Sequence, residues 1–391
     1  FKILNDTLGH HMGDQLLQKV AQRLTRSVRK TDMVARLGGD EFVVMVDDLS
    51  TDAEAAAYKA RALGEKVLKT LREPFQLNGH QHFATPSIGV ASFNGDQNDV
   101  GELLKQADLA MYQAKSMGRN TLCFFDPDMQ ATVSINAAVS SDLRIGLREQ
   151  QFILHYQPQV DRVGVVTGVE ALVRWNHPVR GMRWPAEFIP VAEDTGLILP
   201  LGQWVLERAC ECLRGWADTP GLAHMSLAVN ISAREFRSAG FVAQVSEAVA
   251  RAGINPSRLK LELTESVLLH DTEEIADKMN RLRACGLSFS LDDFGTGYSS
   301  LSYLKRLPLD QLKIDQSFVR DVLTDPNDAA IARTVVALGT SLGLRVIAEG
   351  VETEAQSAFL GAQGCHAYQG YLFSRPLNVA DLEAFLAAWR P

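Results

Sequence analysis

The chain has few cysteines, and none of them are paired at a spacing that would bind a metal. Its 391 residues include five: Cys123, Cys210, Cys212, Cys285 and Cys365. An odd number without a C-x-x-C spacing argues against a zinc site and against a disulfide framework. It favours a reducing compartment. We interpret all five as small core or surface residues.

The sequence also lacks a long apolar run and an excess of positive charge. No segment reaches the roughly 18 apolar residues of a membrane span, and no secretory leader is visible. We expect a cytoplasmic protein, in which an upstream segment of a longer parent could provide an inner-membrane anchor. Lys and Arg number 39 against 47 Asp and Glu, a formal net charge of −8. Because phosphate backbones attract clustered Lys and Arg, a nucleic-acid polymer is excluded as the expected partner.

Residues 1–126 mix helical and strand-like patterns. Helical spacing predicts helices over about 9–28, 53–72 and 100–116. Apolar runs at 33–37 and 42–46, separated by Gly38-Gly39-Asp40-Glu41, predict a hairpin, and further strands are expected at 83–92 and 121–125. This mixture is typical of an α+β, ferredoxin-like or nucleotidyl-cyclase-like domain. The strand that normally precedes the first helix of this topology is missing from the sequence.

Residues 127–137 are mostly polar or small and predict a linker, after which a second domain occupies 138–391. Its eight strand-like runs lie at about 152–160, 166–174, 226–231, 259–264, 287–292, 311–315, 345–349 and 367–373. Strands that alternate with helical patterns indicate a parallel sheet. Eight of them in this length fit a TIM-like (β/α)8 barrel, so the whole chain is expected to be of the α/β class.

Polar side chains recur toward the ends of these strand-like runs, where the active sites of such barrels lie. They are Glu170, Asn230, Glu262, Glu265, Asp292, Asp293, Lys313, Asp315, Glu349 and Glu352. A single buried acid is equally well explained by a structural ion pair, because an unpaired buried charge is costly. Acids on several strands with only one lysine among them favour divalent cations instead. Oxygen ligands suit Mg²⁺ or Mn²⁺, with Ca²⁺ as an inhibitory substitute, and adjacent acids such as Asp292-Asp293 suit a two-metal site for displacement at phosphorus.

The motifs of this domain resemble those of the EAL family of cyclic di-GMP phosphodiesterases. Glu170-Ala171-Leu172 stands as the family signature. It is accompanied by Tyr156-Gln157-Pro158, Arg174-Trp175, Glu262-Leu-Thr-Glu265, Asp292-Asp293-Phe-Gly-Thr-Gly297, Lys313-Ile-Asp315, Glu349-Gly-Val-Glu352 and Gln369-Gly370-Tyr371. The resemblance spans about 138–391, and every catalytic position that can be checked follows the active pattern. It implies hydrolysis of cyclic di-GMP to linear pGpG.

The resemblance also implies a role for each residue. One metal would be held by Glu170, Asn230, Glu262 and Asp292, and the second by Asp292, Asp293 and Glu349. Lys313 would orient or deprotonate the attacking water, with support from Asp315. Glu265 would hold the loop that follows Asp293, and Glu352 would support the ligands. The dinucleotide would contact Gln157, Arg174 and Gln369.

The N-terminal half resembles the GGDEF family of diguanylate cyclases. Gly38-Gly39-Asp40-Glu41-Phe42 is the signature, and Phe1-Lys2-Ile-Leu-Asn5-Asp6, Gly13-Asp14, Ser87-Ile-Gly-Val90 and Lys115 to Asn120 accompany it. Asp40 would bind Mg²⁺ beside Glu41, Asn5 and Asp14 would read guanine, and Lys115 with Arg119 would grip the triphosphate of GTP. Arg29 and Asp32 resemble the family's inhibitory product site, although an ordinary surface pair explains them equally well.

One departure bears on the cyclase activity. The family's metal-binding Asp on the first strand is not in this sequence, so we expect impaired cyclase chemistry here even if a parent protein is competent. The first domain would then either synthesise cyclic di-GMP or bind GTP as a regulator. A homodimer is expected, because each cyclase domain supplies one GTP. An upstream sensory domain is expected in the parent.

Two other readings of the sequence remain open. The pair of domains could be a catalytically silent receptor for cyclic di-GMP or GTP, although such proteins usually lose the metal ligands that are retained here. A barrel with acids and a lysine could also be an enolase-like or aldolase-like enzyme. The Asp292-Asp293 pair favours phosphoryl chemistry over that reading.

Overall fold

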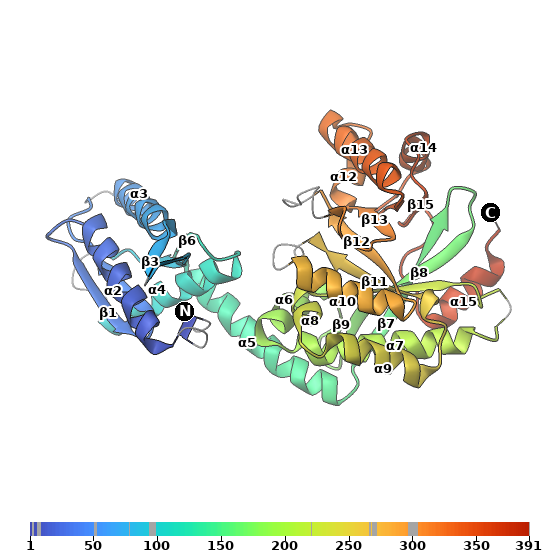
Figure 1. The fold of residues 1–391 in the computed structure, drawn as a ribbon, viewed down its shortest axis with the longest axis horizontal. Helices are drawn as coiled ribbons and strands as arrows, with labels where there is room; N and C mark the ends of the chain where they lie inside the picture. The colour runs from blue at the N-terminus through green and yellow to red at the C-terminus, as the bar shows by residue number, and fades with distance from the viewer. Residues whose placement is uncertain are drawn as a thin grey trace. The chain divides into compact units, whose positions relative to one another are not determined.

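The structure is a computed structural model, and it describes residues 1, 4–5, 9–50, 53–77, 79–93, 99–219, 221–265, 267, 272–295 and 304–390. The chain divides into two compact units, Phe1–Ala137 and Ala138–Pro391. Figure 1 follows the chain from the blue N-terminus to the red C-terminus. Each unit is described separately.

The first unit contains the helices α2 (His10–Ser27), α3 (Ala53–Arg72) and α4 (Val100–Ser116). The predicted hairpin is confirmed: β1 (Met33–Gly38) pairs antiparallel with β2 (Glu41–Met45). The expected strand at 83–92 is shorter, since only β5 (Ile88–Val90) forms and pairs parallel with β6 (Leu122–Phe124). A second hairpin, β3 (Phe75–Leu77) with β4 (His80–His82), was not predicted, because three-residue strands are too short to show a period.

Helix α5 (Pro127–Arg148) covers the range predicted as a linker. Residues in its first half are mostly polar or small, which is why the sequence did not reveal this half as a helix. Val139 and Leu143 are buried in its second half and pack in one cluster with Phe152 and Trp175 of the second unit.

The second unit is the expected eight-stranded barrel, with one strand reversed. Its strands are β7 (Phe152–Asp161), β8 (Val166–His177), β10 (Ser226–Ile231), β11 (Leu259–Thr264), β12 (Ser288–Phe294), β13 (Gln311–Ile314), β14 (Arg345–Ala348) and β15 (Ala367–Tyr368). The sheet closes because β8 pairs with both β7 and β10. The expected parallel direction is wrong for β7, which runs antiparallel to β8 and β15. A short turn, in which Asp161 Oδ1 accepts hydrogen bonds from the backbone N–H groups of Val163 and Val165, joins β7 directly to β8.

Strand β15 is also shorter than the predicted run at 367–373. The chain leaves the sheet at Gln369-Gly370, where it presses against the preceding loop: a Cβ on Gly370 would lie 2.1 Å from the Val351 carbonyl oxygen. The turn that follows is closed by a hydrogen bond from Phe373 N–H to Gly370 O.

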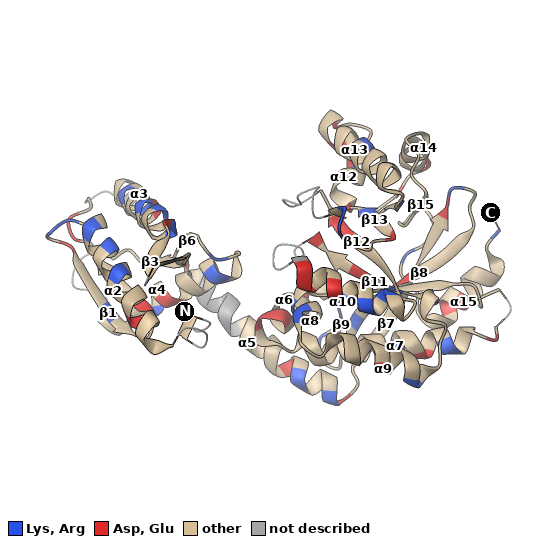
Figure 2. Cartoon of the chain, in the orientation of Figure 1, with Lys and Arg blue, Asp and Glu red and all other residues tan. Residues whose placement is uncertain are grey.

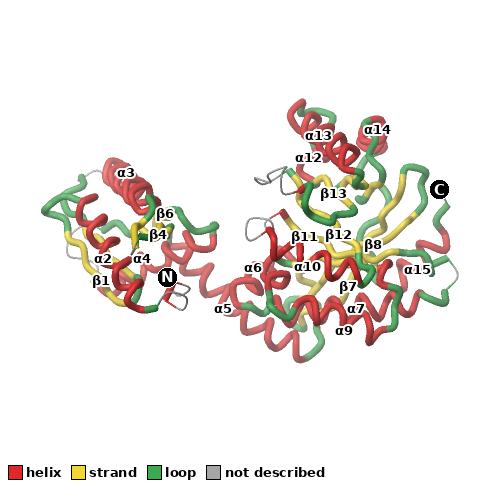
Figure 3. Tube along the Cα trace, viewed as in Figure 1, coloured by secondary structure: helices red, strands yellow, loops and turns green. Residues whose placement is uncertain are grey.

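Helices surround the barrel strands (Figure 3). They are α6 (Pro185–Thr195), α7 (Ile198–Trp216), α8 (Ala233–Arg237), α9 (Phe241–Ala252), α10 (Thr272–Ala284), α12 (Gln316–Arg320), α13 (Pro326–Leu342), α14 (Glu354–Ala362) and α15 (Val379–Ala388), with the short strand β9 (Gly181–Arg183) beside β8. The main apolar core lies between these helices and the strands. Within the described ranges, no helix is long and apolar enough to cross a membrane.

Candidate active site

The predicted acids of the barrel converge on one buried lysine. Lys313 on β13 is fully buried. Its Nζ lies 2.5 Å from Glu262 Oε2, 3.1 Å from Asp292 Oδ2 and 3.5 Å from Glu170 Oε2, and it also forms an ion pair with Glu349. In Figure 2, acidic residues are red and lie on strands of the barrel as well as on its outer helices. Four strands and the residue that follows β14 supply this single cluster.

The protonation of the cluster follows from its charge balance. Burial opposes the charge of Lys313, but the acids around it, led by Asp292, hold its pKa well above the ordinary value. Burial raises the pKa of Glu262 to about 7, and it raises the pKa of Glu349 well above its usual range with the help of Asp292. One ammonium group cannot neutralise four carboxylates, so the cluster retains a demand for further positive charge.

Glu170 is held as an anion by its neighbours in the cluster. Burial opposes its ionisation, but Lys313 and hydrogen bonds from Gln369 and Asn230 lower its pKa. Asn230 Nδ2 donates to Glu170 Oε1 at 2.6 Å, and Gln369 Nε2 donates to Glu170 Oε2 at 2.5 Å. The sequence did not reveal the next link: Gln159 Nε2 donates to Gln369 Oε1 at 3.0 Å. Gln159 lies two residues from Gln157 on β7, so strand alternation was the available signal.

Asp293 and Asp315 face each other beside the cluster. Asp293 has a positive φ of 55°. Burial, together with Asp292 and Asp315, raises its pKa to about 6, and a hydrogen bond with Asp315 contributes. Asp315 also begins helix α12, where its Oδ1 accepts from the backbone N–H of Ser317 at 3.0 Å.

Glu265 and Glu352, the two residues expected to support the loop and the metal ligands, differ in burial. Glu265 is buried, and its Oε2 accepts from the backbone N–H of Gly295 at 3.4 Å. We expected Glu265 to hold the loop that follows Asp293, and this bond reaches the start of that loop. Residues 296–303 lie outside the described part of the chain. Glu352 is exposed, and its backbone N–H donates to Gln356. Its supporting role stays a prediction.

The residues expected to contact a dinucleotide lie around the same mouth. Gln157 is buried, with its Nε2 donating to Ser374 O at 3.1 Å. Arg174 lies four residues beyond Glu170 on β8 and is also buried, yet its Nε has no hydrogen-bond partner in the described structure. Its guanidinium lies over the ring of Trp184, 4.5 Å from the ring centroid, a neighbour that the sequence did not single out.

The residues predicted in the first unit form smaller local arrangements. Asn5 packs against Gly13, where a Cβ would lie 2.0 Å from Asn5 Oδ1, so Asn5 lies beside the turn of α2 that carries Asp14. The backbone N–H of Arg29 donates to Asp32 Oδ2 at 2.7 Å.

Asp40 and Glu41 are exposed at the turn between β1 and β2. Lys115 lies in the last turn of α4, and Arg119 follows the helix with a φ of 62°. Within the described residues, no ion pair joins the two basic residues to the two acids, so their common role in GTP binding stays a prediction.

The barrel cluster fits divalent cations in its donor set but not in its present spacing. Glu262 Oε1 is buried without a hydrogen-bond partner, and the acids outnumber the single ammonium group. In the part of the chain that is described, no three His, Cys, Asp or Glu side chains are spaced to hold one ion. The Lys313 Nζ lies at the point where the acids meet. Cation binding would therefore require the acids to rearrange around Lys313.

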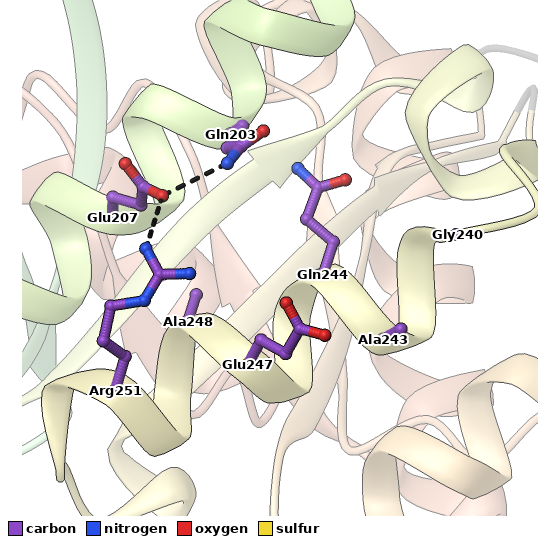
Figure 4. A pocket seen from close by; sticks show the side chains of 8 residues that line it. All are labelled: Gln203, Glu207, Gly240, Ala243, Gln244, Glu247, Ala248 and Arg251. Atoms are coloured by element: carbon purple, nitrogen blue, oxygen red, sulfur yellow. Dashed lines mark hydrogen bonds and ion pairs between the residues drawn. The ribbon is translucent and has the colours of Figure 1, made fainter.

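A groove lies outside the barrel between α7 and α9 (Figure 4). It has a volume of about 290 Å³ and is lined by Gln203, Glu207, Gly240, Ala243, Gln244, Glu247, Ala248 and Arg251. Glu207 accepts hydrogen bonds from Gln203 and Arg251, both at 3.2 Å. The pair of Arg251 with Glu207 joins the two helices, and no residue that lines the groove belongs to the acid cluster.

Comparison with known proteins identifies the class. Residues 140–376 match the EAL domain family, and residues 1–121 match the family described as diguanylate cyclase, GGDEF domain. A solved structure titled "PaMucR Phosphodiesterase, c-di-GMP complex" is 48% identical, with a TM-score of 0.61, and covers 63% of this chain and 99% of that one. The chain therefore belongs to the EAL domain family and carries a GGDEF domain in tandem.

Two curated relatives match almost the full chain. The bifunctional diguanylate cyclase/cyclic di-GMP phosphodiesterase MucR of Pseudomonas aeruginosa is 46% identical over 388 residues, 99% of this chain and 56% of that protein. The cyclic di-GMP phosphodiesterase NbdA of the same species is 44% identical over 391 residues, 100% of this chain and 49% of that protein. The chain thus spans about half the length of these relatives.

Proposed function

We propose that residues 138–391 hydrolyse one phosphodiester bond of cyclic di-GMP to give linear pGpG, with Mg²⁺ or Mn²⁺ bound at the acid cluster. The observation that carries the proposal is the convergence of Glu170, Glu262, Asp292 and Glu349 on one point of the barrel. The relatives named as cyclic di-GMP phosphodiesterases support the choice of substrate.

The resemblance to the EAL family assigns the metal ligands, and the donor set is compatible with that assignment. Glu170, Asn230, Glu262 and Asp292 would hold one cation, and Asp292, Asp293 and Glu349 a second. Bound cations supply the positive charge that stabilises a phosphodiester under attack by water. The amide of Asn230 already donates to Glu170, which leaves its carbonyl oxygen as the ligand atom.

Lys313 is suited to orient water rather than to remove its proton. The surrounding acids keep its pKa well above the ordinary value, so the side chain is an ammonium group and can donate hydrogen bonds but not accept a proton. Asp315, which shares a hydrogen bond with Asp293 beside Lys313, is the better candidate for receiving the proton. Gln157, Arg174 and Gln369 would bind the dinucleotide at the mouth.

We propose that the GGDEF domain binds GTP with Mg²⁺ through Asn5, Asp14, Asp40, Lys115 and Arg119 and regulates the barrel. Synthesis of cyclic di-GMP by a longer, dimeric parent is the alternative role. The position of Asn5 beside the α2 turn that carries Asp14 supports guanine recognition.

One assay tests both proposals. The purified chain is incubated with cyclic di-GMP and Mg²⁺ or Mn²⁺, with and without GTP, and the products are separated by chromatography. We expect pGpG, and a change in rate with GTP if the first domain regulates. Glu170→Ala should abolish hydrolysis, whereas Glu207→Ala, an acid on the outer helix α7, should not. Near-normal turnover by Glu170→Ala would contradict the site assignment.

A further inference from the structure

The mouth of the barrel carries an exposed tryptophan that the proposed roles leave unused. Trp184 is 53% exposed. It follows β9, whose Arg183 pairs with Trp175 of β8, so Trp184 lies across from Arg174. Since Arg174 lies four residues beyond Glu170 on the same strand, the indole lies on the mouth side of the acid cluster.

The backbone of Trp184 and its indole ring each contact a neighbouring side chain. Its backbone N–H donates to Glu187 Oε1 at 2.8 Å at the start of α6, and Glu187 is also paired with Arg183 at 2.7 Å. One face of the ring contacts the guanidinium of Arg174, whose carbon lies 4.5 Å from the ring centroid. A ring fixed in this way loses little freedom when a ligand stacks on it.

Half of the Trp184 surface remains open although Arg174 covers one face. An aromatic face beside a buried arginine is the chemistry that recognises nucleobases, because bases stack on aromatic rings and arginine contributes a cation–π interaction. Arg174 also has a buried Nε without a partner, so a polar group of the same ligand has a donor available there.

We propose that Trp184 is a specificity-determining residue, on whose open face one guanine base of the cyclic dinucleotide stacks while Arg174 backs the other face. The inference rests on the proposed function, because it takes the cyclic dinucleotide as the ligand of the barrel mouth. It adds a base-binding contact outside the acid cluster, and it separates binding of the base from chemistry at the phosphate.

The test uses the intrinsic fluorescence of the full chain. Of the five tryptophans, Trp175 and Trp216 are 2% exposed, and Trp204 and Trp389 are partly buried, so Trp184 is the one most open to a soluble quencher. Cyclic di-GMP is titrated with Ca²⁺ in place of Mg²⁺ to slow turnover, and the binding heat and the quenching by acrylamide are recorded.

We expect cyclic di-GMP to shield Trp184 from acrylamide. Trp184→Phe should lose most of this signal, whereas Trp389→Phe should keep it, because Trp389 is bonded to Gly164 at the opposite end of the barrel. Loss of a stacked base on an aromatic ring costs about 5- to 150-fold in affinity. Trp184→Leu should therefore raise the Kd for cyclic di-GMP by that order, with Trp184→Phe between it and the wild type.

Two further readouts separate contact from disruption. In Trp184→Leu, KM for cyclic di-GMP should rise far more than kcat falls, and Mn²⁺ affinity should equal that of the wild type. If the wild type binds cyclic di-GMP but Trp184→Leu binds equally well and acrylamide quenching is unchanged by ligand, the inference is overturned and the proposed function stands. If the wild type does not bind the dinucleotide, the proposed function fails and the inference fails with it.

Discussion

Replacing Lys313 with methionine tests whether the acids of the barrel are arranged for cations. The ammonium group is fully buried and lies 2.5–3.5 Å from Glu262, Asp292 and Glu170, with Glu349 as a fourth partner. Removing one partner of a buried charge cluster costs about 3–5 kcal/mol, because the remaining charges lose their compensation. For a domain of this size, each kcal/mol shifts Tm by roughly 2–4 °C. In EDTA, the Tm of Lys313→Met should therefore lie about 6–20 °C below that of the wild type.

Divalent metal should restore part of this loss. A cation that binds only the folded state stabilises it by about 2.7 kcal/mol at 100 times its Kd. We expect Mn²⁺ to raise the Tm of Lys313→Met more than that of the wild type, because the variant has no ammonium group among the acids. Hydrolysis should remain lost, since the metal replaces the charge of Lys313 but not its hydrogen bonds to water.

Lys278→Met is the matched control. Lys278 is also a buried lysine, but it donates to the backbone carbonyls of Phe236, Arg237 and Ser238 and pairs with Glu274 on the surface of α10. Its loss should lower Tm without any special response to Mn²⁺. The reasoning fails if Lys313→Met and the wild type have the same Tm in EDTA, or if Mn²⁺ raises the Tm of Lys313→Met and Lys278→Met equally.

Three further substitutions probe other parts of the barrel. Gln159→Glu should lower kcat/KM by about 5- to 150-fold, because the new carboxylate places an acceptor against Gln369 Oε1 and leaves a buried oxygen unpaired. The loss should be larger than in Gln159→Met. Equal rates for the two variants would show that the orientation of the Gln369 amide is unimportant. Burial raises the pKa of Glu235 to about 7, so the free energy of unfolding of the wild type falls as pH rises from about 4.5 to 7. Urea unfolding at pH 8 should therefore show Glu235→Gln to be more stable than the wild type by up to about 3 kcal/mol. The difference should be smaller at pH 5. Gly370→Ala should lower the urea midpoint, because its Cβ would meet the Val351 carbonyl, whereas Gly215→Ala on α7, with nothing within 4 Å, should keep or raise it.

The acids of the site were predictable because charges on otherwise apolar strands are costly and therefore conspicuous. Gln159 and Trp184 carry no such signal: a neutral amide or an aromatic ring in a barrel is ordinary until its neighbours are known. The central position of Lys313 among the acids was likewise out of reach, since only the barrel's closure brings Glu170 and Glu349 to one point.

The antiparallel direction of β7 follows from the short connection between the first two predicted strands. The predicted first and second strands are separated by only a few residues, and parallel neighbours need a crossover of about a dozen or more. Connection length therefore implied a hairpin where the alternation of strands and helices suggested a parallel pair. The helical first half of α5 was harder to predict, because its residues are mostly polar or small, as in a linker.

The reversed strand places one exposed turn at a position suited to labelling the barrel. Since β7 runs against its neighbours, the turn that joins it to β8 opens on the floor of the barrel, remote from the mouth, and Val163 at its tip is 73% exposed. A dye, an affinity label or a surface tether introduced at that tip would report on or immobilise the molecule without obstructing the entry of a nucleotide.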